Sequence, residues 1–242
     1  MTSLPPAGRA DGRAATEKAA LRVRLREARA QVSADDQAIA DAARTDLLLG
    51  LVARWSGPPA TVALYLSRPG EPDTIALAAA LHRSGHTLLV PSPGLGTPWA
   101  SPDWAPYGEP LSPGPRDIPV PPGPGLGAGA LAEAGLIILP GLAGTPGGVR
   151  LGSGGGWYDR ALLVAPEAER WLLVDDREVL EQLPHEGHDL GVDKLITQSR
   201  VVVCQPRAAD PVHESAPFSR KWAPFTDRNG GLRRGEWGGG PW

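Results

Sequence analysis

The sequence contains a single cysteine, Cys204, among 242 residues. One thiol cannot form a disulfide framework or supply the ligands of a structural zinc site. The N-terminal stretch MTSLPPAGRADGRAATEK lacks the apolar segment of a secretory signal peptide, and no apolar run approaches the ~18 residues that span a bilayer. We therefore expect a cytoplasmic protein that folds by packing and does not enter a membrane.

Strong charge of either sign is also missing, because the formal net charge is −3 and the pI is near 6.0. This balance gives no reason to expect a nucleic acid or another polyanion as the main partner. A small-molecule partner fits better, and we expect a monomer. A hydrophobic fraction of 41% over this length can support one sizeable core.

Glycine and proline are abundant instead, with 31 and 27 residues that concentrate in three stretches. Such stretches mark linkers and tails. We predict a disordered tail over residues 1–15, a Pro/Gly-rich insertion or loop over 92–130, and a second disordered tail over 205–242. Residues 16–204 are expected to form a single α/β domain.

Within that domain, apolar runs typical of strands alternate with helical periodicity. The predicted strands span 61–67, 86–91, 135–140, 171–176 and 194–204. The predicted helices span 16–30, the segment from the Ser33 capping box through Leu51, 74–83, 157–165 and 177–183. This alternation favours a three-layer α/β/α arrangement around a mainly parallel sheet.

The first predicted helix carries an apolar stripe that includes Leu21 and Leu25, with a basic edge beside it. Four basic residues fall within a sector of about 80° next to that stripe: Lys18, Arg22, Arg26 and Arg29. A basic edge of this kind is by default a solvated helix face.

Residues 141–160, GLAGTPGGVRLGSGGGWYDR, contain eight glycines between a predicted buried strand and a predicted helix. Backbone amides in such a loop can bind an anion. A Walker loop is excluded because the window has no lysine, and the dinucleotide fingerprint fails at Trp157. The G-x-G-x-x-A match at 125–130 follows a proline-rich segment rather than a strand, so we interpret it as compositional.

The signature of one family coincides with this window at residues 140–143, 148, 150–152, 154, 156 and 158–160. In these residues the chain resembles the 5-formyltetrahydrofolate cyclo-ligases, also called methenyltetrahydrofolate synthetases, and the resemblance extends from about Lys18 to Val203. It implies the three-layer fold and ATP- and Mg²⁺-dependent cyclisation of 5-formyltetrahydrofolate to 5,10-methenyltetrahydrofolate, with release of ADP and phosphate.

The resemblance implies that Lys18, Arg22 and Arg150 stabilise phosphate charge, with no protein nucleophile. It assigns the ATP contacts to these three residues together with Gly152, Ser153, Gly154, Gly155, Gly156 and Tyr158. Phosphoryl transfer depends mainly on positioning and charge neutralisation, which such residues can supply. From the residues alone, each of the three cations can equally be a solvated surface charge.

The resemblance also implies a Mg²⁺ site at Asp159 and Asp189, with Asp193 in reserve. A hard cation that bridges phosphates prefers oxygen ligands. Asp159 has a second interpretation, because an acidic residue in a first turn stabilises a helix dipole. His188 is interpreted as a structural residue and not as a general base.

Leu66 and Glu71 are implied to contact the folate, and a carboxylate suits the N–H donors of a pterin edge. Trp157 and Tyr158 would add flat surface for the substrate. The competing interpretations are core packing for Leu66 and the two aromatic residues, and a turn carboxylate for Glu71.

The chain departs from the family signature at three places within the window. Gly144-Thr145 replaces Phe-Asp, Ser153 replaces an arginine, and Trp157 replaces a tyrosine. Two alternative functions are therefore kept: a non-catalytic paralogue that binds folate or nucleotide, and another ATP-dependent activating enzyme on the same scaffold.

Overall fold

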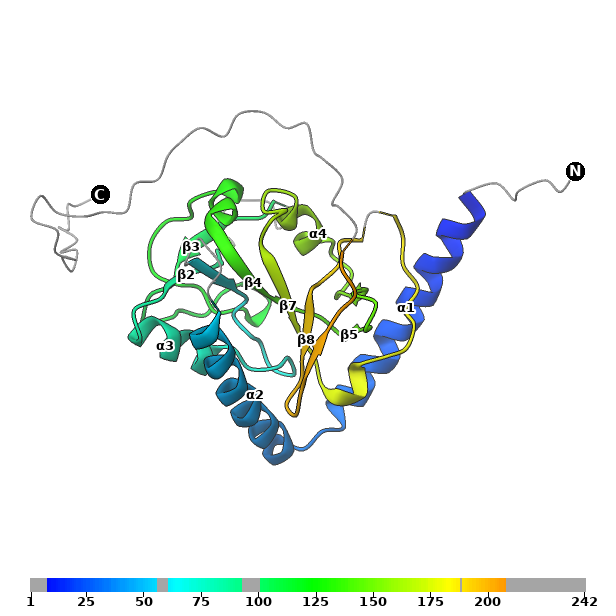
Figure 1. Ribbon diagram of the computed structural model, residues 1–242, viewed down its shortest axis with the longest axis horizontal. Coiled ribbons are helices and arrows are strands. Elements are labelled where there is room, and N and C mark those ends of the chain that lie inside the picture. The colour runs from blue at the N-terminus through cyan, green and yellow to red at the C-terminus, as the bar shows by residue number, and fades with distance from the viewer. Residues whose placement is uncertain (1–7, 56–60, 93–100, 188, 208–242) are drawn as a thin grey trace, which may run out of the picture.

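The computed structural model describes residues 8–55, 61–92, 101–187 and 189–207 (Figure 1). Within them, seven strands form one sheet in the order β3-β2-β1-β4-β7-β8-β9. The strands are β1 (Thr61–Leu64), β2 (Thr87–Pro91), β3 (Trp104–Pro106), β4 (Ala134–Pro140), β7 (Glu169–Leu173), β8 (Lys194–Ile196) and β9 (Val201–Val203). The five inner strands are parallel and the two edge strands are antiparallel. The predicted mainly parallel α/β sheet is confirmed.

The strand order reverses direction between β1 and β4. From β1 the chain moves outward to β2, and it later returns to place β4 on the other side of β1. The connections that follow β1 and β4 therefore diverge, which opens a crevice at the carboxyl ends of these strands. Ligands of open α/β sheets bind at this kind of position.

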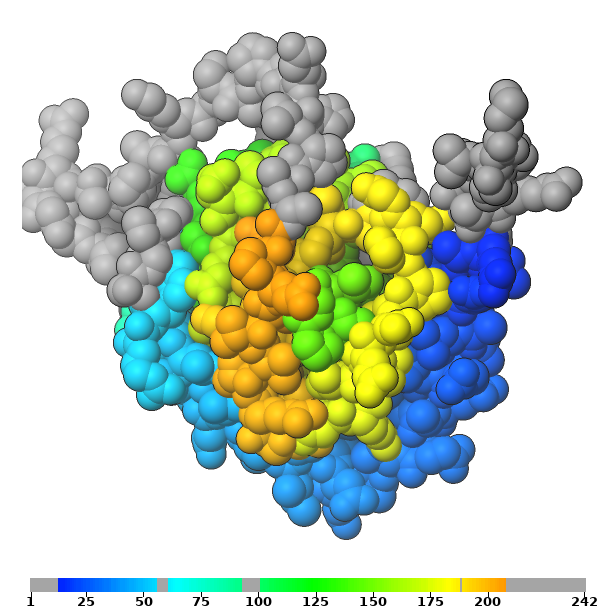
Figure 2. All heavy atoms as spheres, turned by 45° about the vertical axis from the view of Figure 1, so that its right-hand side comes forward, coloured from blue at the N-terminus to red at the C-terminus, as the bar shows by residue number. Residues whose placement is uncertain are grey.

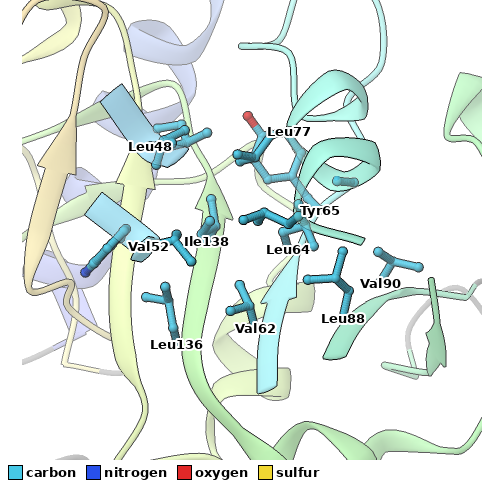
Figure 3. Close-up of a cluster of buried hydrophobic side chains, with 14 of the residues drawn as sticks. Leu48, Val52, Val62, Leu64, Tyr65, Leu77, Leu88, Val90, Leu136 and Ile138 are labelled. Carbon is cyan, nitrogen blue, oxygen red and sulfur yellow. The ribbon is translucent and has the colours of Figure 1, made fainter. Parts of the chain in front are cut away.

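Helices cover both faces of the sheet. The helices α2 (Ala34–Arg54) and α3 (Ile75–Arg83) pack on one face, where Leu48 and Leu77 meet Val62 and Leu64 of β1 (Figure 3). The short helix α4 (Trp157–Leu162) and a 3₁₀ turn (Ala128–Glu133) pack on the other face, with Ala63. Among the described residues, no helix combines the length and apolarity needed to span a membrane.

The first helix, α1 (Gly8–Ala30), lies beside the sheet and not on either face (Figure 1). Its stripe residues Leu21 and Leu25 pack against a small hairpin made of β5 (Ala143–Gly144) and β6 (Arg150–Leu151). Figure 2 shows the segment that follows β7, in yellow, lying against α1, in blue. Because the β5–β6 hairpin lies within residues 141–160, its contact with α1 brings the basic edge of α1 to the glycine-rich window.

Several predicted boundaries differ from the structure. Helix α1 begins at Gly8, so residues 8–15 are helical and not a disordered tail. The predicted loop 92–130 contains β3 and two 3₁₀ turns, although residues 93–100 lie outside the described part. The predicted tail 205–242 is ordered through Arg207, whose guanidinium pairs with Asp193 at 2.7 Å. Residues 208–242 lie outside the described part.

Other predicted elements are shorter or divided. The helix expected over 157–165 ends at Leu162, and in place of the helix expected over 177–183 a short 3₁₀ turn (Asp176–Glu178) overlaps the start of that segment. The strand expected over 194–204 is the antiparallel pair β8–β9. The Ser33 cap is confirmed, because its hydroxyl accepts the Asp36 N–H at 3.1 Å, and helix α2 continues past Leu51.

The departures at 144 and 145 have a packing explanation. A Cβ at Gly144 would lie 2.6 Å from a methyl group of Leu195, so the space that a phenylalanine needs is already filled. Thr145 is buried, and its hydroxyl accepts the N–H of Val149 at 3.2 Å across the hairpin turn. Both residues therefore close the β5–β6 hairpin, which separates β4 from the glycine loop.

Candidate active site

A cleft of about 820 Å³ lies at the carboxyl ends of β1, β2 and β4, with α1 and residues 152–156 along its sides. Its described lining includes seven basic and five acidic residues, although the whole chain has more acidic than basic residues. Positive charge is thus concentrated here, which favours an anionic ligand. All predicted site residues except Asp193 line this cleft.

The glycine loop, residues 152–156, is fixed to α1 through backbone carbonyls. Arg22 Nε donates to the carbonyl of Gly152 at 2.9 Å, and Arg26 Nη2 donates to the carbonyl of Ser153 at 2.8 Å. Gly154 has φ of +106°, and a Cβ there would lie 3.5 Å from the Arg22 guanidinium. A side chain at Gly154 would therefore be strained by the backbone conformation, although its Cβ would make only an ordinary contact with this arginine.

Arg150 lies under the loop and pairs with Asp159. Its side chain is 4% exposed, and Nη2 donates to Asp159 Oδ1 at 2.5 Å. Its buried Nε has no hydrogen-bond partner among the described residues. A Cβ at Gly152 would approach Arg150 Nη1 to 3.2 Å, so the bare backbone lets the guanidinium reach this position. The interpretation of Arg150 as a solvated charge is wrong.

Lys18 is buried and pairs with two carboxylates. Its ammonium donates to Asp189 Oδ2, and to Glu186 Oε2 at 2.7 Å. Burial lowers the pKa of Lys18, but hydrogen bonds to Asp189 and Glu186 outweigh it and raise the pKa above the ordinary value. Lys18 therefore stays protonated at neutral pH. Sequence reasoning missed Glu186, whose position is set by a contact 168 residues away.

The two predicted metal carboxylates lie close together. Asp159 Oδ1 accepts the N–H of Leu190, the residue after Asp189, at 3.5 Å, and Asp189 Oδ2 accepts the N–H of Glu186 at 2.7 Å. Asp193 is different, because its carboxylate accepts the backbone N–H of Arg170 at 2.7 Å and it does not line the cleft. The structure gives the reserve assignment of Asp193 no support.

The residues predicted to contact folate come from two segments: Leu66 and Glu71 follow β1, and Trp157 and Tyr158 begin α4. Leu66 is 2% exposed and belongs to the core, yet it borders the cleft at the end of β1. Glu71 lies in the following turn and accepts Arg68 Nε at 3.0 Å. Leu66 can therefore pack in the core and also contact a ligand. In the same way, Glu71 can stabilise the turn and also contact a ligand.

Trp157 and Tyr158 also combine packing with a place in the cleft lining. Their ring centroids are 4.8 Å apart, and Trp157 lies 5.3 Å from the fully buried Trp104. Burial, with a smaller contribution from Glu71, raises the pKa of Tyr158 far above its ordinary value, so the phenol stays neutral. Its buried hydroxyl has no hydrogen-bond partner among the described residues.

A buried network of ion pairs holds α1 in place. Arg29 forms a bidentate pair with Glu178 at 2.6 and 2.8 Å and also donates to the carbonyl of Gly141 at 2.6 Å. Glu178 accepts the N–H of Asp175, and Asp175 accepts the fully buried Arg44 at 2.6 Å. The default interpretation of Arg29 as a solvated residue is wrong.

The cleft chemistry suits a divalent cation that is shared with phosphates. No group of three or more His, Cys, Asp or Glu side chains gathers as a metal site among the described residues, which omit His188. Asp159 and Asp189 nevertheless offer carboxylate oxygens on partly exposed side chains. Mg²⁺ is commonly bound by one or two carboxylates plus substrate phosphates. The residues present therefore fit this ion.

The fold and the cleft together define the class: an α/β protein with a charged ligand cleft at its strand-order reversal. Residues 14–198 match the model of the 5-formyltetrahydrofolate cyclo-ligase family. The chain belongs to this family, whose members are enzymes. A 5-formyltetrahydrofolate cyclo-ligase of Mycolicibacterium smegmatis is 34% identical over 148 residues, which cover 59% of this chain and 76% of the relative.

Two solved structures share the fold. The NMR structure of Aquifex aeolicus 5,10-methenyltetrahydrofolate synthetase is 23% identical, with a TM-score of 0.64 over 84% of this chain and 97% of the other. The 5,10-methenyltetrahydrofolate synthetase of Mycoplasma pneumoniae is 17% identical, with a TM-score of 0.56 over 76% and 99% of the respective chains. At these identities the likeness establishes the fold alone.

Proposed function

We propose that this protein converts 5-formyltetrahydrofolate to 5,10-methenyltetrahydrofolate, with hydrolysis of ATP to ADP and phosphate and with Mg²⁺. One observation carries the proposal. A single cleft gathers the basic residues of α1, the bare glycine loop, two adjacent carboxylates and the aromatic pair Trp157–Tyr158. The membership of the chain in the cyclo-ligase family supports the same reaction.

The reaction needs activation of a formamide oxygen, which is a poor leaving group. Transfer of the γ-phosphoryl group of ATP to that oxygen would let N10 of the folate attack the formyl carbon, and phosphate would then leave. In this proposal Lys18, Arg22 and Arg150 neutralise phosphate charge, and the amides of residues 152–156 add donors. Positioning of the two substrates supplies much of the remaining rate enhancement.

The carboxylates Asp159 and Asp189 would hold Mg²⁺, which supplies neutralisation of phosphate charge when bound. In the structure, each of them pairs with one of the side chains proposed to bind phosphate: Asp159 pairs with Arg150, and Asp189 pairs with Lys18. Ligand binding would release these cations toward the phosphates. Each of these four side chains would thus have a partner of opposite charge in both states, which avoids the cost of uncompensated buried charge.

For the folate, Glu71 would accept hydrogen bonds from N–H groups of the pterin. Leu66, Trp157 and Tyr158 would supply apolar surface. Glu71 is already oriented by Arg68, whose Nε and backbone N–H both point to its carboxylate at 3.0 and 3.4 Å. A carboxylate held in this way loses little freedom when it binds a substrate donor.

The experiment is a direct assay of product formation. Purified protein is mixed with 5-formyltetrahydrofolate and Mg·ATP, and the absorbance of the methenyl product is followed. We expect product from the wild type and a loss of about 100-fold or more with Asp159→Ala, because one charge-stabilising group is typically worth that much. Absence of product from the wild type, or equal product from the variant, would contradict the proposal.

The product assay together with calorimetric binding measurements separates the two alternative functions. A non-catalytic paralogue would bind 5-formyltetrahydrofolate in a calorimeter without forming product. A different activating enzyme would bind ATP tightly and bind the formylfolate weakly.

A further inference from the structure

The glycine loop contains no charged side chain of its own. Residues 152–156 are glycines except for Ser153, yet they line a cleft that is rich in charge. Cations from three elements lie beside this loop: Arg150 of β6 next to Gly152, Arg160 of α4, which donates to the carbonyl of Gly155 at 3.2 Å, and two arginines of α1. The two from α1, Arg22 and Arg26, stand one turn apart. Each of them donates to the carbonyl of one loop residue, Gly152 for Arg22 and Ser153 for Arg26.

These two contacts set the direction of the loop amides. In a trans peptide unit the N–H points opposite to the C=O. Because the carbonyls of Gly152 and Ser153 point to α1, the N–H groups of Ser153 and Gly154 point away from it. Neither of these N–H groups donates a hydrogen bond within the described part of the chain. Two successive amides with this orientation are typical of an anion-binding concavity.

Arg26 differs from its neighbour Arg24 in a way that the sequence does not show. Both arginines are exposed on the same helix, but only Arg26 lines the cleft and contacts the loop. A guanidinium carries five N–H donors, and Arg26 uses Nη2 for the carbonyl of Ser153. Its remaining donors can bind a second acceptor at the rim of the cleft.

We propose that Arg26 is a further phosphate-binding residue of this chain. It orients the Ser153–Gly154 peptide unit, and it places a guanidinium beside Ser153, whose own side chain offers only a hydroxyl. The ligand class is the phosphate chain of a nucleoside triphosphate, and in this respect the inference rests on the function proposed above. The default interpretation of Arg26 as a purely solvated residue is thereby replaced.

The test compares Arg26→Gln with the matched control Arg24→Gln. Both substitutions remove one exposed positive charge from α1, so a general loss of attraction for ATP affects them equally. With calorimetric titration of ATP, we expect Arg26→Gln to weaken binding by about tenfold, as for the loss of a charged hydrogen bond. We expect Arg24→Gln to change the Kd by less than about twofold, as is usual for a remote surface charge.

Steady-state kinetics and a rescue variant give the second readout. Arg26→Gln should raise the KM for ATP and leave the KM for 5-formyltetrahydrofolate unchanged, a separation that a general structural defect would not produce. Ser153→Arg in the Arg26→Gln background should restore most of the ATP affinity, because it returns a guanidinium to the same rim. Thermal unfolding of each variant checks that the fold is kept.

Three results would overturn the inference: equal effects of the two single substitutions, wild-type affinity of Arg26→Gln for ATP, or no ATP binding by the wild type. Failure of the proposed function has a different signature. In that case the wild type binds ATP, and the binding depends on Arg26, but no methenyl product forms.

Discussion

Two groups of ion pairs are built from the same residue types and differ in burial. In the cleft, Arg150 pairs with Asp159 and Lys18 pairs with Asp189, and the side chains of the two aspartates are 26% and 19% exposed. In the buried network, Glu178, which pairs with Arg29, and Asp175, which pairs with Arg44, have side chains only 2% and 10% exposed. Burial therefore separates pairs that a ligand can exchange from pairs that only hold the fold.

The physical reason is the cost of an unpaired charge. Breaking a buried pair leaves one charge without water or partner, which costs several kcal/mol, whereas a partly exposed carboxylate can be hydrated or take a cation. In the cleft, an incoming anion and metal ion would replace the lost partners on both sides. Arg44, Asp175 and Glu178 do not line the cleft, and Arg29, which does, is held by its bidentate pair with Glu178. The network therefore fixes α1 while the cleft pairs exchange.

The largest effect is expected from Arg44→Met, which breaks the buried network at its fully enclosed arginine. Asp175 and Asp41 would lose their shared cation, and the free energy of unfolding should fall by about 3–5 kcal/mol. Urea denaturation measures this change, with the exposed Arg24→Met as the control. A loss below about 1 kcal/mol would remove the distinction between the two groups of pairs.

The next effect is expected from Lys18→Met in the cleft. The rate of product formation should fall by about 100-fold, because one cation that stabilises phosphate charge is removed. The free energy of unfolding should fall by less than for Arg44→Met, because the side chains of Asp189 and Glu186 are 19% and 17% exposed and can be hydrated. Initial rates and urea curves measured on the same preparation test the comparison. A stability loss as large as that of Arg44→Met would contradict it.

A smaller effect is expected at Glu169, which accepts Lys194 at 2.6 Å and the indole N–H groups of Trp171 and Trp55. Burial raises the pKa of Glu169, but these partners outweigh it and lower the pKa below the ordinary value. The stabilisation is therefore present above the unfolded-state pKa and is lost as pH falls through the folded-state pKa.

Glu169→Gln should thus lower the unfolding free energy at pH 7 by about 1 kcal/mol or less. Denaturation curves of wild type and variant, recorded from pH 7 down to about pH 3, should converge toward the acid end. A constant difference across this range would show that the charge of Glu169 is not the cause.

The smallest effect is expected from a truncation after Arg207. Every described residue that lines the cleft lies between Ala15 and Asp189, and the described contacts of the C-terminal segment end with the Arg207 pair. Activity and thermal unfolding should match the full chain within error. A second truncation after Cys204, which also removes Arg207, should lower stability, and equal behaviour of the two would argue against a role for this pair.

Strands β1, β2, β4 and β7 could be predicted because they are continuous apolar runs, which carry their own signal. The edge strand β3 could not, because its three residues lie in the proline-rich segment that we interpreted as an insertion or loop. The hairpin β5–β6 could not, since each of its strands has only two residues. The glycines and prolines of residues 1–15 favour a tail, but residues 8–15 belong to α1, where Arg13 and Glu17 pair across one turn.

In the site, the residues within the glycine window were accessible to sequence reasoning because their spacing is local. Arg26, Arg29 and Glu186 were not, because a charged residue on a helix or loop gives no sign of a partner more than 100 positions away. The resemblance to the family offers Asp193 as a reserve metal ligand, whereas in the structure its carboxylate pairs with Arg207 and does not line the cleft.

The docking of α1 also has a consequence for the order of events during synthesis. This helix leaves the ribosome before the other described elements, and the partners of Arg22 and Lys18 lie 130 and 171 positions later in the chain. Contacts at such separations close late because the intervening chain must be ordered first. The cleft is therefore completed only after the segment around Asp189 has emerged, and a shorter nascent chain lacks the carboxylate partners of Lys18.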